Sequence, residues 1–325
     1  MGVLGVGFLA VSLAACAEGR SEGQLGLVEG FAGLIAADEP QAVLIGRDVL
    51  GNGGTAIDAA VAMYFTMTVS LPARVGLGGG GLCVLFDGDE GSGEAIEFLP
   101  RAAPSGGIVP AGVRGIAAMH ARHGVVRWER LVSPAENLAR FGLRVSRAFR
   151  NDLEAGRDVI FANETLRRIY TRDGELPQVG DQIVQAELSG VLAGVRQQGA
   201  AYVHAGPLTA RLAEASSAVG MPLSSEDIRN SLPELRPTVE IAIGDDVAYF
   251  APPRSNGGVV AAQIWKVAEE IGDYSDLDGA DAAHVFAEAS ARAFGDRARW
   301  QAADGSARVA AASLVDDERA RGLMA

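Results

Sequence analysis

Cysteine and basic residues are scarce in this sequence of 325 residues. Its two cysteines stand in dissimilar contexts, which argues against a disulfide and excludes a cysteine-rich metal site. The sequence has 28 lysine and arginine residues and 41 acidic residues, so the formal net charge is −13. Nearly all of the basic residues are arginines, and lysine, as at Lys266, is rare. Because no run of basic residues offers a surface for phosphates, we expect no nucleic acid partner. The hydrophobic content of 48% is typical of a folded chain with one large domain or two smaller ones.

The N-terminal segment has the pattern of an export leader. Residues 5–15 form an apolar run too short to span a bilayer, and residues 18–24 are polar. The motif L-A-A-C that ends at Cys16 resembles the bacterial lipobox, in which the cysteine becomes the lipidated first residue of the mature protein. A plain signal peptide cut near Ala15 or Ala17 is the alternative. We therefore expect an exported bacterial protein, either periplasmic or anchored to the membrane as a lipoprotein.

Residues 1–24 are thus interpreted as leader and linker, and residues 25–325 as one domain, because no repeat, linker or change of composition divides them. Period-two alternation with turn residues predicts hairpins over residues 82–99 and 239–251. Hydrophobic periodicity predicts helices over residues 43–50, 55–69, 112–148 and 282–300, a helix from residue 258, and short helices over 151–206.

A glycine run occupies residues 76–81 (G-L-G-G-G-G). Such loops bind phosphates when they join a strand to a helix, but this run follows a helix and leads into a strand. It also lacks the Lys-Ser/Thr pair of a phosphate-binding loop. We expect that the glycines instead allow close backbone approach to another element or to a ligand.

Two patterns of charged residues have local structural interpretations. Thr55 and Asp58 stand three residues apart at a helix start, which predicts a capping box. Glu288, Arg292 and Asp296 recur every four residues, which predicts a solvated ladder of ion pairs on one helix face. Neither pattern indicates a catalytic acid or base.

The sequence offers little for metal or thiol chemistry. His120 and His123 stand three apart, but no cysteine or carboxylate completes a metal set nearby, so surface or core histidines are the favoured interpretation. Cys83 follows the glycine run and is interpreted as a buried thiol in a strand. The G-x-S-x-G, H-E-x-x-H and Ser-x-x-Lys motifs of other hydrolases are absent.

Six segments resemble, in order, motifs of the γ-glutamyltransferases, which are self-cleaving N-terminal-nucleophile hydrolases. Residues 53–62 (G-G-T-A-I-D-A-A-V-A) are similar to the family's G-G-N-A-x-D-A-A-V-A, and residues 252–258 (P-P-R-S-N-G-G) to its P-P-P-S-S-G-G. The other four segments are residues 72–81, 109–115, 118–124 and 288–299. Each match is weak alone, but six in the family's order are specific.

The resemblance implies an α/β fold, the αββα sandwich of N-terminal-nucleophile hydrolases, with this chain as its large-subunit portion. The complete enzyme would hydrolyse or transfer γ-glutamyl groups from glutathione-like donors through an acyl-enzyme, without a metal or organic cofactor. The nucleophile would be a threonine at the new N-terminus of a small subunit, where its own amine acts as base. Nothing in residues 1–325 resembles the T-T-H-x-x-V context of that threonine. We therefore expect no catalytic residue in this chain, which would be inactive alone.

The resemblance also indicates where a donor carboxylate would bind. The family uses an arginine within a D-F-R-E-T-A-P segment, since a guanidinium gives a carboxylate two parallel hydrogen bonds. Residues 98–104 (F-L-P-R-A-A-P) match this segment, but Pro100 takes the arginine's position and Arg101 follows one residue late. A one-residue shift turns a side chain to the opposite face of a strand, so Arg101 would serve only where the backbone is bulged. Arg74, just before the glycine run, is the second candidate.

Three alternatives stay open. A related enzyme could act on another amide, such as a β-lactam side chain, because the arginine is displaced. A catalytically dead scaffold or binding lipoprotein could retain the fold without the chemistry. The chain could also be a fragment without independent function. A downstream threonine with its histidine-containing context would favour the enzyme.

Overall fold

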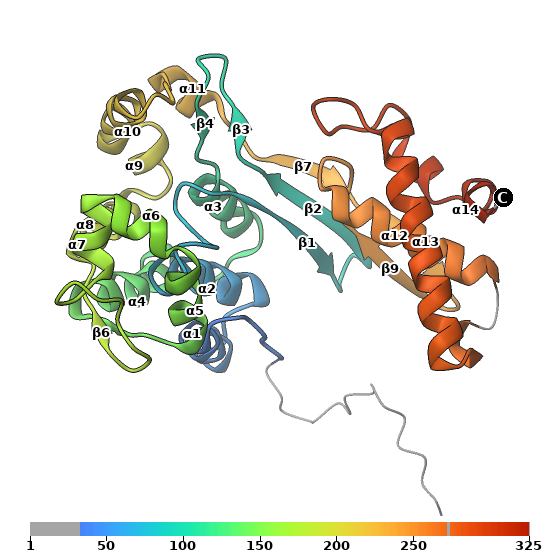
Figure 1. The fold of residues 1–325 in the computed structure, drawn as a ribbon, viewed down its shortest axis with the longest axis horizontal. Helices are drawn as coiled ribbons and strands as arrows, with labels where there is room; N and C mark the ends of the chain where they lie inside the picture. Colours follow the sequence, from blue (N-terminus) through green and yellow to red (C-terminus); the bar gives the residue numbers. More distant parts are fainter. Residues whose placement is uncertain (1–32, 272–273, 325) are drawn as a thin grey trace, which may run out of the picture.

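The computed structural model describes residues 33–271 and 274–324, in which two groups of helices flank short antiparallel strands (Figure 1). The expected leader, with Cys16, lies outside the described residues. No helix within the described ranges is long and apolar enough to cross a membrane.

The first group of helices surrounds one large hydrophobic core. Phe65 of α2, Leu131 of α4 and Leu192 of α8 are among its fully buried side chains. Helix α2 packs against both α1 and α4, and α4 packs against α8. The helices of this group are α1 (Pro40–Gly51), α2 (Ala56–Ser70), α3 (Gly112–His123), α4 (Trp128–Phe141), α5 (Arg147–Ala155), α6 (Arg157–Ala162), α7 (Glu164–Tyr170), α8 (Ala186–Gln198), α9 (Ala201–His204), α10 (Pro207–Ala218) and α11 (Ser225–Asn230).

The start of α2 confirms the predicted capping box. The Asp58 side chain accepts a hydrogen bond from the Thr55 amide at 2.9 Å, and the Thr55 hydroxyl accepts one from the Asp58 amide at 3.2 Å. Asp58 is fully buried and also accepts from the amides of Val125 and Val126, each at 3.2 Å. The carboxylate therefore fixes the loop between α3 and α4 as well as the helix start.

A three-stranded antiparallel sheet follows the first helices. Its order is β1 (Gly81–Asp87), β2 (Ser92–Phe98) and β7 (Glu234–Pro237), with β2 in the centre. The predicted hairpin of β1 and β2 is confirmed, but β7 was not predicted. Two-residue strands also pair as β3 (Arg101–Ala102) with β4 (Ile108–Val109) and as β5 (Leu143–Arg144) with β6 (Gln182–Ile183).

The second predicted hairpin is also confirmed, as β8 (Val239–Ile243) and β9 (Asp246–Phe250). Its turn contains Gly244 at a φ of 58°, in the left-handed region that glycine adopts without strain. The hairpin packs on β1 and β2 through Tyr249, whose ring lies 5.4 Å from the Phe86 ring and against Gly93.

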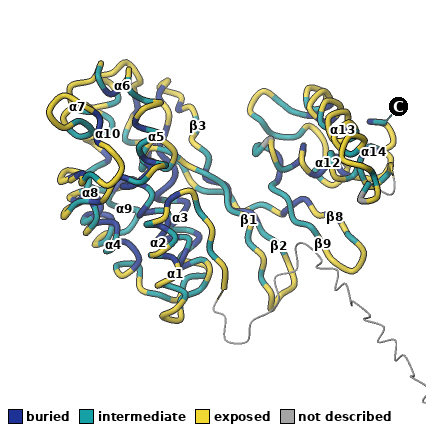
Figure 2. Tube along the Cα trace, turned by 60° about the horizontal axis from the view of Figure 1, so that its bottom comes forward, coloured by how far each residue is buried: buried dark blue, intermediate teal, exposed yellow. Residues whose placement is uncertain are grey.

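The second group of helices covers this hairpin. A separate hydrophobic core joins Ile241 of β8 with Val259 and the fully buried Trp300. The elements are α12 (Asn256–Ile271), η1 (Tyr274–Asp276), α13 (Gly279–Trp300), η2 (Ala311–Leu314) and α14 (Asp317–Met324). Figure 1 shows the resulting order of layers as helices, the β1-β2-β7 sheet, the β8-β9 hairpin and helices, and Figure 2 shows buried residues concentrated in the two helical groups.

One prediction on α13 is wrong. Glu288 and Arg292 form an exposed ion pair at 2.6 Å, but Asp296 is buried and belongs to no solvated ladder. It accepts hydrogen bonds from Arg319 at 2.7 Å and from Gln263 at 2.9 Å. Each four-residue step overshoots a 3.6-residue turn by about 40°, so two steps rotate Asp296 toward α12 and α14.

Candidate functional site

The glycine run packs directly against the end of β2. A Cβ atom added to Gly80 would lie 2.1 Å from the Phe98 carbonyl oxygen and 2.8 Å from Pro100 Cδ, so only glycine fits there. The carbonyl of Gly79 accepts hydrogen bonds from the amides of Ala111 and Gly112, both at 2.9 Å. The predicted close backbone approach is confirmed, and it fixes the start of β1 and α3 beside residues 98–101.

Pro100 and Arg101, which follow β2, lie in different environments. Residues 99 and 100 lie between β2 and β3, outside both strands, and Pro100 contacts the glycine run. The Arg101 side chain instead meets Glu97, four residues earlier, and Glu234 of β7. The position that the family motif gives to its arginine thus faces the glycines, while Arg101 lies among carboxylates.

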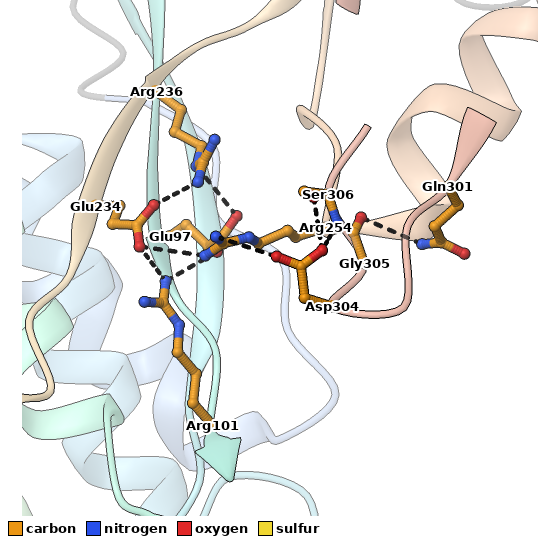
Figure 3. A network of polar contacts seen from close by, with 9 residues as sticks. All are labelled: Glu97, Arg101, Glu234, Arg236, Arg254, Gln301, Asp304, Gly305 and Ser306. Carbon is orange, nitrogen blue, oxygen red and sulfur yellow. Dashed lines mark hydrogen bonds and ion pairs between the residues drawn. The ribbon is translucent and has the colours of Figure 1, made fainter. Parts of the chain in front are cut away.

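Arg101 is part of a network of ion pairs that joins strands β2, β3 and β7 to loops of the second helical group (Figure 3). Its Nη2 atom lies 2.6 Å from Glu234 Oε1 and 3.3 Å from Glu97 Oε1. Arg254 Nη1 lies 3.2 Å from Glu234 Oε1 and 3.5 Å from Glu97 Oε1. Arg236 pairs with Glu234 and lies 3.6 Å from Glu97 Oε2. Three guanidinium groups therefore surround two carboxylates.

Strand register explains why so many charges gather here. Glu97 and Glu234 are direct cross-strand partners in the β2–β7 pair, so their side chains extend from the same face. Like charges in this position repel, and Glu97 is fully buried, so the pair is stable only with cations between them. Arg236 follows Glu234 by two residues and lies on the same face, while Arg101 comes from the start of β3 and Arg254 from the loop before α12.

The backbone at Arg254 is strained for a residue with a side chain. Its φ is 86°, in the left-handed region. Proline fixes φ near −65°, so the third proline of the P-P-P-S-S-G-G motif could not take this conformation. The ion pairs with Glu97 and Glu234 supply a physical reason for the strained turn, because they hold the guanidinium against the buried charge.

The network stabilises the partly exposed carboxylate of Glu234 as an anion. Burial acts to raise the pKa of Glu234, but hydrogen bonds from Arg101 and Arg236, together with the charges of Arg101 and Arg254, hold the pKa below the usual value for a carboxyl group. Glu234 therefore remains charged at neutral pH and continues to attract Arg101.

Arg74, the other candidate, lies beside the glycine run and is also engaged. Its Nε and Nη2 atoms donate to Asp152 at 2.9 Å each, a two-point contact with one carboxylate. Asp38 lies 3.7 Å from Nη1. Arg74 borders a hollow of about 260 Å³ together with the glycine run, Cys83 and Phe98. The structure therefore does not bring Arg74 and Arg101 into one cluster.

The remaining residues considered for metal or thiol chemistry, His120, His123 and Cys83, make contacts that stabilise the fold. His120 Nε2 lies 2.8 Å from the Val126 carbonyl oxygen, and His123 pairs with Glu94. Cys83 lies in β1 as predicted but is only partly buried, and burial raises the pKa of its thiol. No group of three or more His, Cys, Asp or Glu residues suited to a metal occurs in the described ranges.

Comparison with known proteins identifies the class of fold first. The solved structure of Helicobacter pylori gamma-glutamyltranspeptidase aligns with a TM-score of 0.83 at 27% identity, covering 91% of this chain and 92% of that chain. The Bacillus anthracis transpeptidase CapD aligns with a TM-score of 0.77 at 27% identity, covering 88% of this chain and 97% of that chain. The fold is therefore the large-subunit portion of the α/β, N-terminal-nucleophile hydrolase type, as the sequence motifs predicted.

Sequence comparison then gives the family. The Gamma-glutamyltranspeptidase profile matches residues 42–106 and 104–324. The glutathione hydrolase proenzyme of Escherichia coli (strain K12) is 28% identical over 295 residues, which is 82% of this chain and 50% of that protein. This chain belongs to the γ-glutamyltranspeptidase family of enzymes. It spans about half the length of the curated relatives that it matches.

Sequence reasoning identified Arg101 but missed its partners. No helical or alternating pattern in the sequence distinguishes Glu97, Glu234 or Arg254 from other charged residues, and the three are far apart along the chain. The departure from the family motif at Arg254, where a proline is usual, was the one available signal.

Proposed function

We propose that this chain is the large-subunit part of an enzyme that hydrolyses or transfers γ-glutamyl groups from glutathione-like donors, with the nucleophilic threonine outside residues 1–325. The observation that carries the proposal is the family match over residues 42–324 in a chain about half as long as its curated relatives. Alone, this chain is inactive, because it would lack both the nucleophile and the base.

The chemistry follows from the proposed nucleophile. The threonine hydroxyl attacks the γ-carbonyl carbon of the donor, and its own α-amine takes the hydroxyl proton. The carbon–nitrogen bond of the donor breaks, and the departing amine receives the proton. Water then releases glutamate by hydrolysis, or an acceptor amine takes the γ-glutamyl group by transfer. The large subunit contributes binding and orientation of the donor rather than bond making.

We propose Arg101 as the side chain that binds the donor α-carboxylate, with Arg74 as the alternative. A guanidinium suits this task because it forms two parallel, charge-assisted hydrogen bonds to a carboxylate. Arg101 is 39% exposed and lies within residues 98–104, which match the family's donor-binding segment, one residue after the position of the family's arginine. Arg74 is more exposed, but Asp152 already takes its Nε and Nη2 atoms.

The partner in this proposal is a small subunit that completes the sandwich. An apolar hollow of about 810 Å³ lies between the β8-β9 hairpin and helices α12 and α13. Trp265 and Phe286 border it and are 44% and 56% exposed, which is unusual for large apolar side chains. An exposed apolar region of this kind supports the need for a covering chain.

The test begins with the complete reading frame, expressed and analysed by intact mass. Two masses split at a threonine, together with hydrolysis of γ-glutamyl-p-nitroanilide, are expected. Arg101→Ala should then raise the KM for this donor at least tenfold, while Arg74→Ala should have a smaller effect. A single uncleaved mass without hydrolysis would reject the enzyme. The catalytically dead scaffold and the fragment without independent function would then be the remaining alternatives.

A related amide acylase is favoured by one observation. Pro100 stands where the family motif has its carboxylate-binding arginine, and Arg101 is already paired with acidic side chains. A panel of acyl anilides with and without a carboxylate decides between the two enzymes. Faster hydrolysis of acyl groups without a carboxylate would support the acylase and reject the γ-glutamyl donor.

We also propose export to the periplasm with a lipid anchor at Cys16. The support is the L-A-A-C sequence after an apolar run. Cys16→Ala should move the protein from the membrane fraction to the soluble fraction and abolish labelling with radioactive palmitate. An unlabelled wild type whose mature N-terminus follows Ala15 or Ala17 would show a plain signal peptide instead.

A further inference from the structure

The contacts of Arg101 assign a role to Glu234, a residue that no motif singled out. We propose that Glu234 is a specificity-determining residue, whose carboxylate occupies Arg101 until the α-carboxylate of a donor displaces it. This inference rests on the proposed function, because it takes Arg101 as the donor-binding side chain. It adds an internal competitor that weakens the binding of carboxylate-bearing donors.

The geometry of the guanidinium group carries the argument. A carboxylate can form two parallel hydrogen bonds along either of two edges, Nε with Nη2 or Nη1 with Nη2. The Nη2 atom belongs to both edges. That atom carries two N–H groups, one for each edge. Glu234 Oε1 lies 2.6 Å and Glu97 Oε1 lies 3.3 Å from Nη2 of Arg101, so the two carboxylates together compete for the nitrogen that both two-point positions need. A donor carboxylate must therefore displace one of them or accept a single hydrogen bond.

Burial decides which of the two carboxylates leaves. Glu97 also contacts Nη2, at 3.3 Å, but its side chain is fully buried and cannot reach water. Glu234 is 33% exposed and Arg101 is 39% exposed, so solvent or a ligand can reach their contact. The shorter contact to Arg101 is therefore also the one that can exchange.

The rest of the network lets Glu234 move without an isolated charge. When it releases Arg101, Glu234 still has Arg236 and Arg254 as partners. Buried Glu97 also keeps these two arginines, at 3.6 Å and 3.5 Å. Arg101 then keeps only its longer contact with Glu97, at 3.3 Å, and can face the donor. Figure 3 shows the network with Glu234 still in contact with Arg101.

The experiment compares two amino acids that differ only in the α-carboxylate. Calorimetry measures the dissociation constants of L-glutamate and 4-aminobutyrate with the product of the complete reading frame. Glu234→Gln keeps the side-chain size but removes the charge, so L-glutamate should bind about two to five times more tightly, the contribution of one partly exposed ion pair. The affinity for 4-aminobutyrate should not change, and Arg101→Ala should abolish the preference for L-glutamate.

Two further variants keep the result interpretable. Asp304→Asn is the matched control, because Asp304 lies in the same network but contacts Arg254, at 3.9 Å, and should leave both affinities unchanged. Glu234→Asp keeps the charge but shortens the side chain, and it should tighten L-glutamate binding to a smaller extent than Glu234→Gln. If Glu234→Gln does not fold, this second variant provides the measurement.

Unchanged or weaker L-glutamate binding in the Glu234 variants would overturn the inference, as would equal tightening of 4-aminobutyrate or no binding of L-glutamate at all. Hydrolysis of γ-glutamyl-p-nitroanilide in the same preparations separates this inference from the proposed function. Hydrolysis without an effect of Glu234 rejects the inference alone. A Glu234 effect on binding without hydrolysis rejects the proposed activity alone.

Discussion

The buried histidine of α9 should make the stability of this protein depend strongly on pH. His204 is fully buried, and within the described part of the chain its Nε2 atom has no hydrogen-bond partner. Burial and, secondarily, the charge of Arg114 lower the pKa of His204 from 6.5 to about 4. Arg114 is held nearby by hydrogen bonds to the carbonyls of Arg229 and Ser231, at 2.6 Å and 2.7 Å.

The sign and size of the effect follow from proton linkage. Between pH 6.5 and pH 4 the unfolded chain binds the proton that the folded chain excludes, so stability is present above pH 6.5 and is lost as the pH falls. The lowered pKa corresponds to about 3.4 kcal/mol in full, of which about 1.4 kcal/mol is lost at pH 5.5 and about 2.5 kcal/mol at pH 4.5.

Urea denaturation at pH 7.5, 5.5 and 4.5 measures this loss. Because other groups also titrate, the informative quantity is the difference between the wild type and His204→Gln, whose stability should fall by about 2.5 kcal/mol less between pH 7.5 and 4.5. His284 is exposed on α13, so His284→Gln is the matched control and should behave as the wild type does. Parallel pH dependence of the wild type and His204→Gln would refute the reasoning.

Three further changes test the packing around the site by the free energy of unfolding in urea. Gly80→Ala should destabilise the protein by about 3 kcal/mol, because the new methyl group collides with the Phe98 carbonyl. Gly78→Ala is the control, because its methyl group meets no atom within 4 Å, and equal effects of the two changes would contradict this reasoning. Asp58→Ala should cost about 3 kcal/mol, since it leaves the amides of Thr55 and Val125 without their carboxylate acceptor. A loss below about 1 kcal/mol would reject its role in the loop. A double-mutant cycle of Asp296→Asn and Arg319→Met should give a coupling energy of about 1–3 kcal/mol, and additive effects would argue against their contact.

Local signals in the sequence predicted local features of the fold well. Thr55 and Asp58 lie within one turn, and the glycine run owes its role to backbone size alone, so both could be identified from neighbouring residues. The two hairpins and most of the helices followed from periodicity, but α10, α11 and α14 were not predicted. Family motifs supplied the overall architecture, which periodicity alone does not specify.

Features that depend on distant partners could not be predicted. Strand β7 has only four residues, among them two charged side chains and a proline, and it is a strand because it pairs with β2. Asp296 is buried because α14 brings Arg319 to it. The pairing of Glu97 with Glu234 would be rejected from sequence as repulsive, and it becomes understandable only when Arg101 and Arg254 are seen between them.

The path of the chain between the two hydrophobic cores bears on how the protein is made. The backbone passes from the first helical group to the second once within the described chain, between Pro237 of β7 and Val239 of β8. Because all residues of the first core precede those of the second along the chain, the first core emerges first and can assemble before the second is complete. Phe86 on β1 then lacks its contact with the Tyr249 ring until the β8-β9 hairpin forms. That interval is when a nascent chain would expose its sheet to a chaperone or to a neighbouring chain.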